Sequence, residues 1–154
     1  MPTLFVSGDL FHHPGLKAFA HGCNCAGAMG KGIALEFRER FPRMYAEYKA
    51  RCTDGRFVLG DVFVWSEPGG VTVFNLATQK TTRTRADIQA IETALARMLA
   101  AAVATQIERI GLPRVGAGLG GLPWEEVRAL LEKVGASTAI ELIVFETYLP
   151  RPTA

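Results

Sequence analysis

The chain has 154 residues, enough for one domain that buries a core without structural metals or disulfides. Its apolar fraction of 49%, charged fraction of 21% and net charge of +2 are those of an ordinary globular domain, and they argue against a surface that is basic throughout. No apolar run is long enough to cross a bilayer, no secretory pattern precedes the first strand, and the odd number of cysteines favours reduced thiols and a cytoplasmic location.

A glycine-rich stretch, residues 21–34, is the most informative part of the N-terminal third. It follows two short apolar runs that predict strands, Thr3–Val6 and Lys17–His21, and it precedes an amphipathic run, Ile33–Phe41, that predicts a helix. Glycines let the backbone turn and approach a ligand closely, and free N–H groups at a helix N-terminus attract phosphate. The stretch therefore predicts either a phosphate-binding loop or a tight strand-to-helix turn without a ligand.

The rest of the chain alternates strands and helices. Two β-rich runs separated by Pro68-Gly69-Gly70 predict a hairpin, and a second glycine-rich loop, Gly116–Gly121, follows a strand and precedes a helix that starts at Pro123. In chain order, the predicted elements are a short helix that ends before Asp54, strands Asp61–Trp65 and Val71–Leu76, a helix over Arg85–Gln106, a strand over Arg109–Val115, a helix to Gly135 and a strand over Ala139–Tyr148.

This alternation predicts an α/β fold, a three-layer α/β/α sandwich with a mixed, largely parallel central sheet. We expect one domain over residues 1–154, with a core from about 3 to 148 and a short C-terminal tail, 149–154. In such folds ligands bind beyond the carboxyl ends of the strands. Both glycine-rich loops lie at strand-to-helix junctions, so they should meet at that edge, where two phosphate-binding loops would suit a diphosphate.

Three polar residues near this edge are candidates for chemistry, and each has a plainer alternative. Asp9 can accept a hydrogen bond from an amine such as that of adenine, or cap a turn. Asn24 can bind a ribose diol, or close an Asx turn. Lys80 can hold an anion or act as a nucleophile, or be an ordinary surface lysine. No metal site is expected, because the histidine and cysteines of the first glycine-rich stretch lack a second ligand pair at the usual spacing.

Five segments, taken together and in order, resemble a macrodomain. They are Gly8-Asp9-Leu10-Phe11, His21-Gly22-Cys23-Asn24, Met29-Gly30-Lys31-Gly32-Ile33-Ala34, Asn75-Leu76-Ala77-Thr78-Gln79-Lys80 and Pro113-Arg114-Val115-Gly116-Ala117-Gly118-Leu119-Gly120-Gly121-Leu122-Pro123-Trp124. The resemblance covers about Thr3 to Tyr148. Within that family, the segments more narrowly resemble the branch that holds the terminal ADP-ribose protein glycohydrolase and the DarG antitoxins.

The resemblance implies a hydrolase that binds ADP-ribose and releases mono-ADP-ribose from a modified acceptor, either thymidine in DNA or a glutamate or aspartate of a protein. It implies no cofactor and a monomer. Lys80 and Asn24 match the catalytic positions, and Lys80 would attack the anomeric carbon of the distal ribose or stabilise charge while water attacks. A non-catalytic ADP-ribose reader and an O-acetyl-ADP-ribose deacetylase are the alternatives. The ADP-ribose-binding residues that it implies are Gly8, Asp9, Leu10, Met29, Gly30, Lys31, Gly32, Ile33, Thr78, Gly116, Ala117, Gly118, Leu119, Gly120 and Gly121.

One position departs from the protein-directed enzyme of this branch. That enzyme carries an acidic residue in the second glycine-rich loop, whereas this chain has Gly120, followed by Gly121. The resemblance to DarG-like members includes glycine at this position. It therefore favours ADP-ribosylated thymidine in DNA as the substrate.

Overall fold

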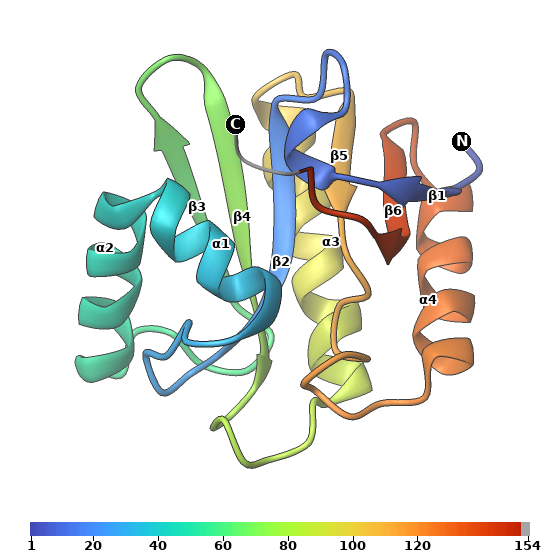
Figure 1. Ribbon diagram of the computed structural model, residues 1–154. Helices are drawn as coiled ribbons and strands as arrows, with labels where there is room; N and C mark the ends of the chain where they lie inside the picture. The colour runs from blue at the N-terminus through green and yellow to red at the C-terminus, as the bar shows by residue number, and fades with distance from the viewer. Residues whose placement is uncertain (152–154) are drawn as a thin grey trace.

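The computed structural model describes residues 1–151, which form a six-stranded sheet with helices packed on both faces (Figure 1). The elements are β1 (Leu4–Gly8), the 3-10 helix η1 (Leu10–His12), β2 (Ala18–Asn24), α1 (Gly32–Arg40), α2 (Pro42–Thr53), β3 (Val62–Glu67), β4 (Val71–Gln79), α3 (Ile88–Ala104), β5 (Arg109–Leu112), α4 (Trp124–Ala136) and β6 (Glu141–Tyr148). Of the helices described, none combines the length and apolarity needed to cross a membrane.

The sheet is mixed and largely parallel, as the sequence predicts. Its strand order is β1-β6-β5-β2-β4-β3, and the strands pair in parallel except at the edge, where β3 runs antiparallel to β4. The β3–β4 hairpin brings Glu67 opposite Val71 across the Pro-Gly-Gly turn. The predicted hairpin and the predicted sheet type are therefore confirmed.

Alternating side chains of the strands enter two hydrophobic cores, one on each face of the sheet. In β2, Ala18 and Ala20 belong to the core that contains residues of α3 and α4, whereas Phe19 and Cys23 belong to the core that contains residues of α1 and α2. Successive strand residues point to opposite faces, so both faces of β2 are buried. This packing gives the three-layer α/β/α sandwich that the sequence predicts.

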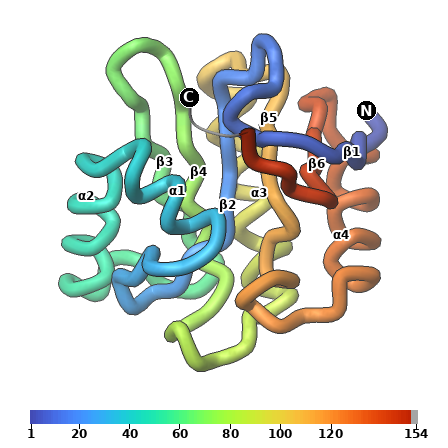
Figure 2. Tube along the Cα trace, viewed as in Figure 1, coloured from blue at the N-terminus to red at the C-terminus, as the bar shows by residue number. Residues whose placement is uncertain are grey.

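The connections of the sheet place a crevice between β2 and β5. These strands are neighbours, but β2 leads into α1 on one face and β5 leads into α4 on the other. When the loops after two adjacent strands turn towards opposite faces of the sheet, a crevice forms between the loops. Ligands of open α/β sheets bind in this crevice. Both glycine-rich loops and the loop from β4 to α3 meet at this edge, which is the lower end of the sheet in Figure 2.

Several element boundaries differ from the sequence prediction. β2 continues to Asn24 instead of ending at His21, and β5 ends at Leu112 instead of Val115, before Pro113, which has no N–H to donate.

Two other differences arise from hydrogen bonds that the apolar pattern does not reveal. β4 continues three residues beyond Leu76, because it keeps pairing with β2 until Gln79 lies opposite Asn24. α3 begins at Ile88, three residues later than predicted, because the carboxylate of Asp87 accepts hydrogen bonds from N–H groups of the first helical turn. Both differences extend or define the edge of the sheet where the glycine-rich loops lie.

Candidate functional site

Two adjoining cavities form a cleft at the carboxyl ends of the parallel strands. One has a volume of about 500 Å³ and the other of about 440 Å³. Both are bordered by Gly22, Lys31, Gln79 and Leu119, so they meet where the two glycine-rich loops face each other. Volumes of this size are typical of small-molecule sites.

Most residues of the predicted ADP-ribose site border this cleft. The larger cavity is lined by the predicted residues Lys31, Gly32, Ile33, Thr78, Gly116, Gly118, Leu119 and Gly120. The smaller cavity is lined by the predicted residues Asn24, Met29, Gly30, Lys31 and Leu119. The remaining predicted residues lie outside the lining of both cavities, and they are Gly8, Asp9, Leu10, Lys80, Ala117 and Gly121.

Asn24 closes the first glycine-rich loop on itself. Its side-chain oxygen accepts hydrogen bonds from the N–H groups of Ala26 (3.0 Å) and Ala28 (3.2 Å), and its amide donates to the carbonyl oxygen of Ala28 (2.8 Å). The hydroxyl of Tyr48, a buried residue of α2, donates to the carbonyl oxygen of Asn24 (2.6 Å). The Asx turn considered from the sequence is therefore present. It uses one of the two amide hydrogens of Asn24.

Lys80 directly follows β4 and lies beside the loop that Asn24 closes. The N–H of Cys25 donates to the carbonyl oxygens of Gln79 (2.9 Å) and Lys80 (3.2 Å), which ties the end of β2 to the end of β4. The side chain of Lys80 is exposed, and its neighbours Gln79 and Thr82 border the smaller cavity. Asn24 lies opposite Gln79 in the β2–β4 ladder, so the backbones of the two predicted catalytic residues are close, whereas Lys80 itself lines neither cavity.

The second glycine-rich loop is too compact to accept a side chain at position 120. A Cβ atom on Gly120 would lie 2.5 Å from the carbonyl oxygen of Gly116 and 2.8 Å from its Cα. That oxygen also accepts a hydrogen bond from the N–H of Leu122 (3.0 Å), while the oxygen of Gly120 accepts one from the N–H of Ala86 (2.8 Å). An acidic residue at position 120 therefore requires the loop to move.

Asp9 lies at the end of β1 and is held by hydrogen bonds from within the chain. Its carboxylate accepts from the N–H groups of Phe11 (2.9 Å) and Arg151 (2.7 Å) and pairs with His12 Nδ1 (2.8 Å). Burial alone would raise the pKa of Asp9, but these hydrogen bonds together lower it. Asp9 therefore caps the N-terminus of η1, and this 3-10 helix lies where the sequence predicted a turn. The hydroxyl of Tyr148, 3.5 Å away, connects Asp9 to the wall of the larger cavity.

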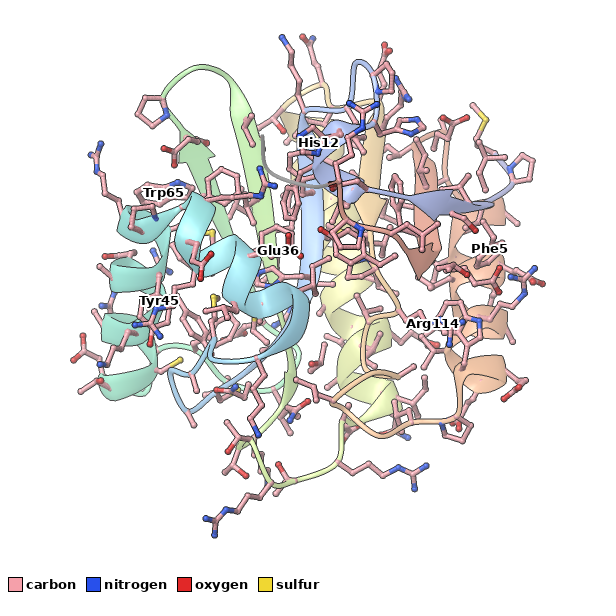
Figure 3. All side chains as sticks on the ribbon, in the orientation of Figure 1. Phe5, His12, Glu36, Tyr45, Trp65 and Arg114 are labelled. Carbon is pink, nitrogen blue, oxygen red and sulfur yellow. The ribbon has the colours of Figure 1, made fainter. Side chains whose placement is uncertain are left out.

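The sequence prediction missed the wall of the larger cavity that Arg114 and the end of β6 provide. Arg114 Nε donates to the carbonyl oxygen of Glu146 (2.6 Å), and its guanidinium lies 5.0 Å from the ring centroid of Trp124. Figure 3 shows Arg114 on the α4 side of the molecule. The indole of Trp124 donates to the carboxylate of Glu146 (2.9 Å), and this hydrogen bond is the largest cause of the lowered pKa of Glu146. In the sequence, the only indication of this wall is that a basic residue, Arg114, comes two residues before the second glycine-rich loop.

A buried histidine of β2 lies at the start of the first glycine-rich stretch. His21 is fully buried, stacks on Phe37 with ring centroids 3.9 Å apart, and donates from Nε2 to Oδ1 of Asn75 (2.7 Å). Burial lowers the pKa of His21 to about 4, so the ring is neutral at neutral pH. Burial raises the pKa of Cys25 to about 11, which keeps its thiol protonated. Within residues 1–151, no cluster of three His, Cys, Asp or Glu side chains is arranged to hold a metal ion.

Known proteins are similar to this chain over most of its length. The chain is 34% identical over 147 residues to the DNA ADP-ribosyl glycohydrolase of Thermus aquaticus, covering 92% of this chain and 40% of that protein. It is 31% identical over 142 residues to the ADP-ribose 1''-phosphate phosphatase of Candida albicans, covering 84% of this chain and 91% of that protein. The solved macrodomain of Mycobacterium tuberculosis DarG matches with a TM-score of 0.85 and 29% identity, covering 97% of this chain and 98% of that one.

The family model "Macro domain" matches residues 20–131, a range that includes both glycine-rich loops and the whole of β4. The chain spans less than half the length of the DNA ADP-ribosyl glycohydrolases that it matches. The macrodomain resemblance read from the sequence is confirmed by the family model, by these relatives and by the fold. The chain belongs to the macrodomain family.

Proposed function

We propose that this chain binds ADP-ribose in the cleft and hydrolyses the bond between the distal ribose and a modified acceptor, with ADP-ribosylated thymidine in DNA as the main acceptor. The observation that carries the proposal is a two-loop cleft that Asn24 lines at one end, next to the backbone of Lys80. Lys80 and Asn24 lie beside each other at the ends of β4 and β2. The 34% identity to a DNA ADP-ribosyl glycohydrolase supports the same acceptor.

The parts of the cleft correspond to the parts of ADP-ribose. The first glycine-rich loop leads into α1, whose free N–H groups and positive dipole end suit a diphosphate. Lys31 borders both cavities and supplies a cation where they meet. In this arrangement the adenosine occupies the larger cavity, towards Tyr148 and Asp9, and the distal ribose occupies the smaller one, towards Asn24.

The reaction takes place at the anomeric carbon of the distal ribose. In one route the neutral amine of Lys80 attacks this carbon, the acceptor leaves with a proton, and water then cleaves the ribosyl–lysine bond. In the other route water attacks directly, and the charged Lys80 stabilises negative charge on the departing acceptor. Both routes yield free ADP-ribose and unmodified acceptor. Both also require Asn24 to orient the ribose through its remaining amide hydrogen.

The second glycine-rich loop favours a base-linked acceptor over a carboxylate-linked one. The protein-directed enzyme resolves its lysine intermediate with the help of an acid in this loop, and the backbone of Gly116 leaves no room for one at Gly120. The same observation supports the second candidate function, a reader that binds ADP-ribose without cleaving it. The two functions differ in whether free ADP-ribose is released.

A three-substrate assay separates these functions. The substrates are an oligonucleotide with ADP-ribose on thymidine, a protein with ADP-ribose on glutamate, and ADP-ribose 1''-phosphate. We expect the highest kcat/KM for release of ADP-ribose from the oligonucleotide. Binding of ADP-ribose without release from any substrate would identify a reader. Turnover of the phosphate alone would contradict the proposal and match the Candida albicans relative instead.

A further inference from the structure

The three loops around the cleft have a concentrated positive charge. The segments 21–34, 76–86 and 113–122 contain no acidic residue, and their basic residues are Lys31, Lys80, Arg83, Arg85 and Arg114. The one acid between β4 and α3 is Asp87, whose carboxylate caps the N-terminus of α3. Five positive charges exceed the formal net charge of the whole chain, +2, so the rest of the molecule is net acidic. The diphosphate of ADP-ribose accounts for some of this charge but lies next to Lys31, at the junction of the two cavities.

The basic residues between β4 and α3 are not neutralised within the chain. Lys80, Arg83 and Arg85 are exposed, and among residues 1–151 none of them forms an ion pair. By contrast, Arg97 pairs with Asp61 at 2.9 Å elsewhere on the surface. Unpaired exposed cations on one loop raise the local positive potential and attract an anionic partner.

The backbone of this loop is held in one conformation. The hydroxyl of Thr81 accepts hydrogen bonds from the N–H groups of Arg83 (3.2 Å) and Thr84 (3.1 Å), and the N–H of Thr81 donates to the hydroxyl of Thr84 (2.9 Å). The amide of Gln79 donates to the carbonyl oxygens of Thr81 (2.8 Å) and Thr84 (3.2 Å). Side chains of the loop extend into solvent at the lower end of Figure 3. We name residues 81–85 the basic turn.

The basic turn lies at the acceptor end of the cleft. Thr82 and Arg83 border the smaller cavity together with Asn24, whereas the larger cavity has neither of them in its lining. The N–H of Ala86, directly after the turn, donates to the oxygen of Gly120 (2.8 Å) and fixes the turn against the second glycine-rich loop. An acceptor attached to the distal ribose therefore leaves the cleft beside Arg83.

We propose that the basic turn binds the backbone phosphates of a single-stranded nucleic acid on either side of the modified nucleotide, with Arg83 and Arg85 as the phosphate contacts. The proposal rests on the function proposed above. A nucleic acid strand carries one phosphate per nucleotide next to the modified base, whereas a glutamate or aspartate loses its charge when it is modified. The modified base must leave a duplex stack to enter the cleft, so a strand that is already single binds without the cost of unpairing and unstacking. The turn thereby selects polymeric DNA over an isolated nucleoside.

Salt dependence of binding measures these contacts directly. The probe is a short, unmodified, fluorescein-labelled thymidine oligonucleotide, and its binding is followed by fluorescence anisotropy between 50 and 200 mM salt. Two phosphate contacts to a single strand contribute a slope of about −1.4 in a plot of log K against log salt, or about a sevenfold loss of affinity over this range. R83Q/R85Q should lose this contribution. The control K17Q/R43Q removes two exposed cations away from the cleft, one before β2 and one on α2, and should keep it.

Turnover supplies the second readout. R83Q/R85Q should lower kcat/KM for an ADP-ribosylated oligonucleotide at least about sevenfold more than for ADP-ribosylated thymidine at low salt, because the nucleoside has no flanking phosphates. Thermal unfolding establishes that both double variants are folded. An unchanged salt slope in R83Q/R85Q overturns the proposal, and so does equally tight binding of a poly-glutamate peptide. Oligonucleotide binding through the turn without release of ADP-ribose from any substrate would instead contradict only the proposed function.

Discussion

Replacing Gly120 with alanine should destabilise the protein, whereas the same change at Gly118, in the same loop, should not. A methyl group at position 120 would lie 2.5 Å from the carbonyl oxygen and 2.8 Å from the carbonyl carbon of Gly116. These are backbone atoms, so no side-chain rotation relieves the clash. Overpacking of this kind costs about 1–3 kcal/mol. Moving the loop to relieve it breaks the hydrogen bond from the N–H of Ala86 to the oxygen of Gly120, which costs about 1 kcal/mol.

Thermal unfolding and ADP-ribose binding test this prediction together. For a chain of this length, a loss of about 1–3 kcal/mol lowers Tm by about 2–12 °C. A Cβ atom on Gly118 meets no atom within 4 Å, so Gly118→Ala should melt close to the wild type. Gly120→Ala should also bind ADP-ribose more weakly by calorimetry, because its loop borders the larger cavity. If both variants melt at the same temperature, crowding by Gly116 is not the reason that position 120 is glycine.

Three further predictions concern buried hydrogen bonds near the cleft. In the native protein His21 has a pKa of about 4 and stays neutral, whereas in the unfolded chain it gains a proton as the pH falls below about 6.5. Because the unfolded state then binds more protons, the free energy of unfolding should fall by about 3 kcal/mol between pH 6.5 and 4. Urea titrations of His21→Gln should lack this part of the fall; an identical pH dependence would refute it. Tyr48→Phe removes the donor to the carbonyl oxygen of Asn24 and should cost about 1–3 kcal/mol in urea unfolding, and a neutral effect would contradict this. Asp9→Asn replaces one of two accepting carboxylate oxygens with an NH2 group, which then faces a backbone N–H donor, and it should cost about 1–3 kcal/mol; unchanged stability would show that the tail contact is dispensable.

The order and type of the main elements could be predicted because they depend on local patterns. The apolar stripe over Ile88–Ala104 and the proline and acidic residues at the start of α4 identify helices without any long-range information. Strand ends were less predictable, because β4 continues to Gln79 only through pairing with β2. The 3-10 helix η1 depends on the side chain of Asp9, and the sequence alone leaves that residue free to form other turns.

The candidate site likewise has features that the sequence predicts and features that depend on the folded structure. The meeting of the two glycine-rich loops at one edge of the sheet was predictable, since glycine content and strand-to-helix position both appear in the sequence. The crowding that fixes Gly120 was not, because it depends on the folded path of the loop around Gly116. The wall formed by Arg114 and β6 was also missed, because β5 and β6 become neighbours only in the sheet. The closeness of the backbones of Lys80 and Asn24 likewise depends on strand pairing.

Single-turnover release of ADP-ribose from a thymidine-modified oligonucleotide by Lys80→Ala tests the central claim most directly. If Lys80 acts on the anomeric carbon, release should slow by at least about 100-fold, while calorimetry shows an affinity for ADP-ribose similar to that of the wild type. Lys17→Ala, an exposed lysine before β2, serves as the matched control and should release ADP-ribose normally. Release by Lys80→Ala at the wild-type rate would contradict the account and remove Lys80 from the chemistry.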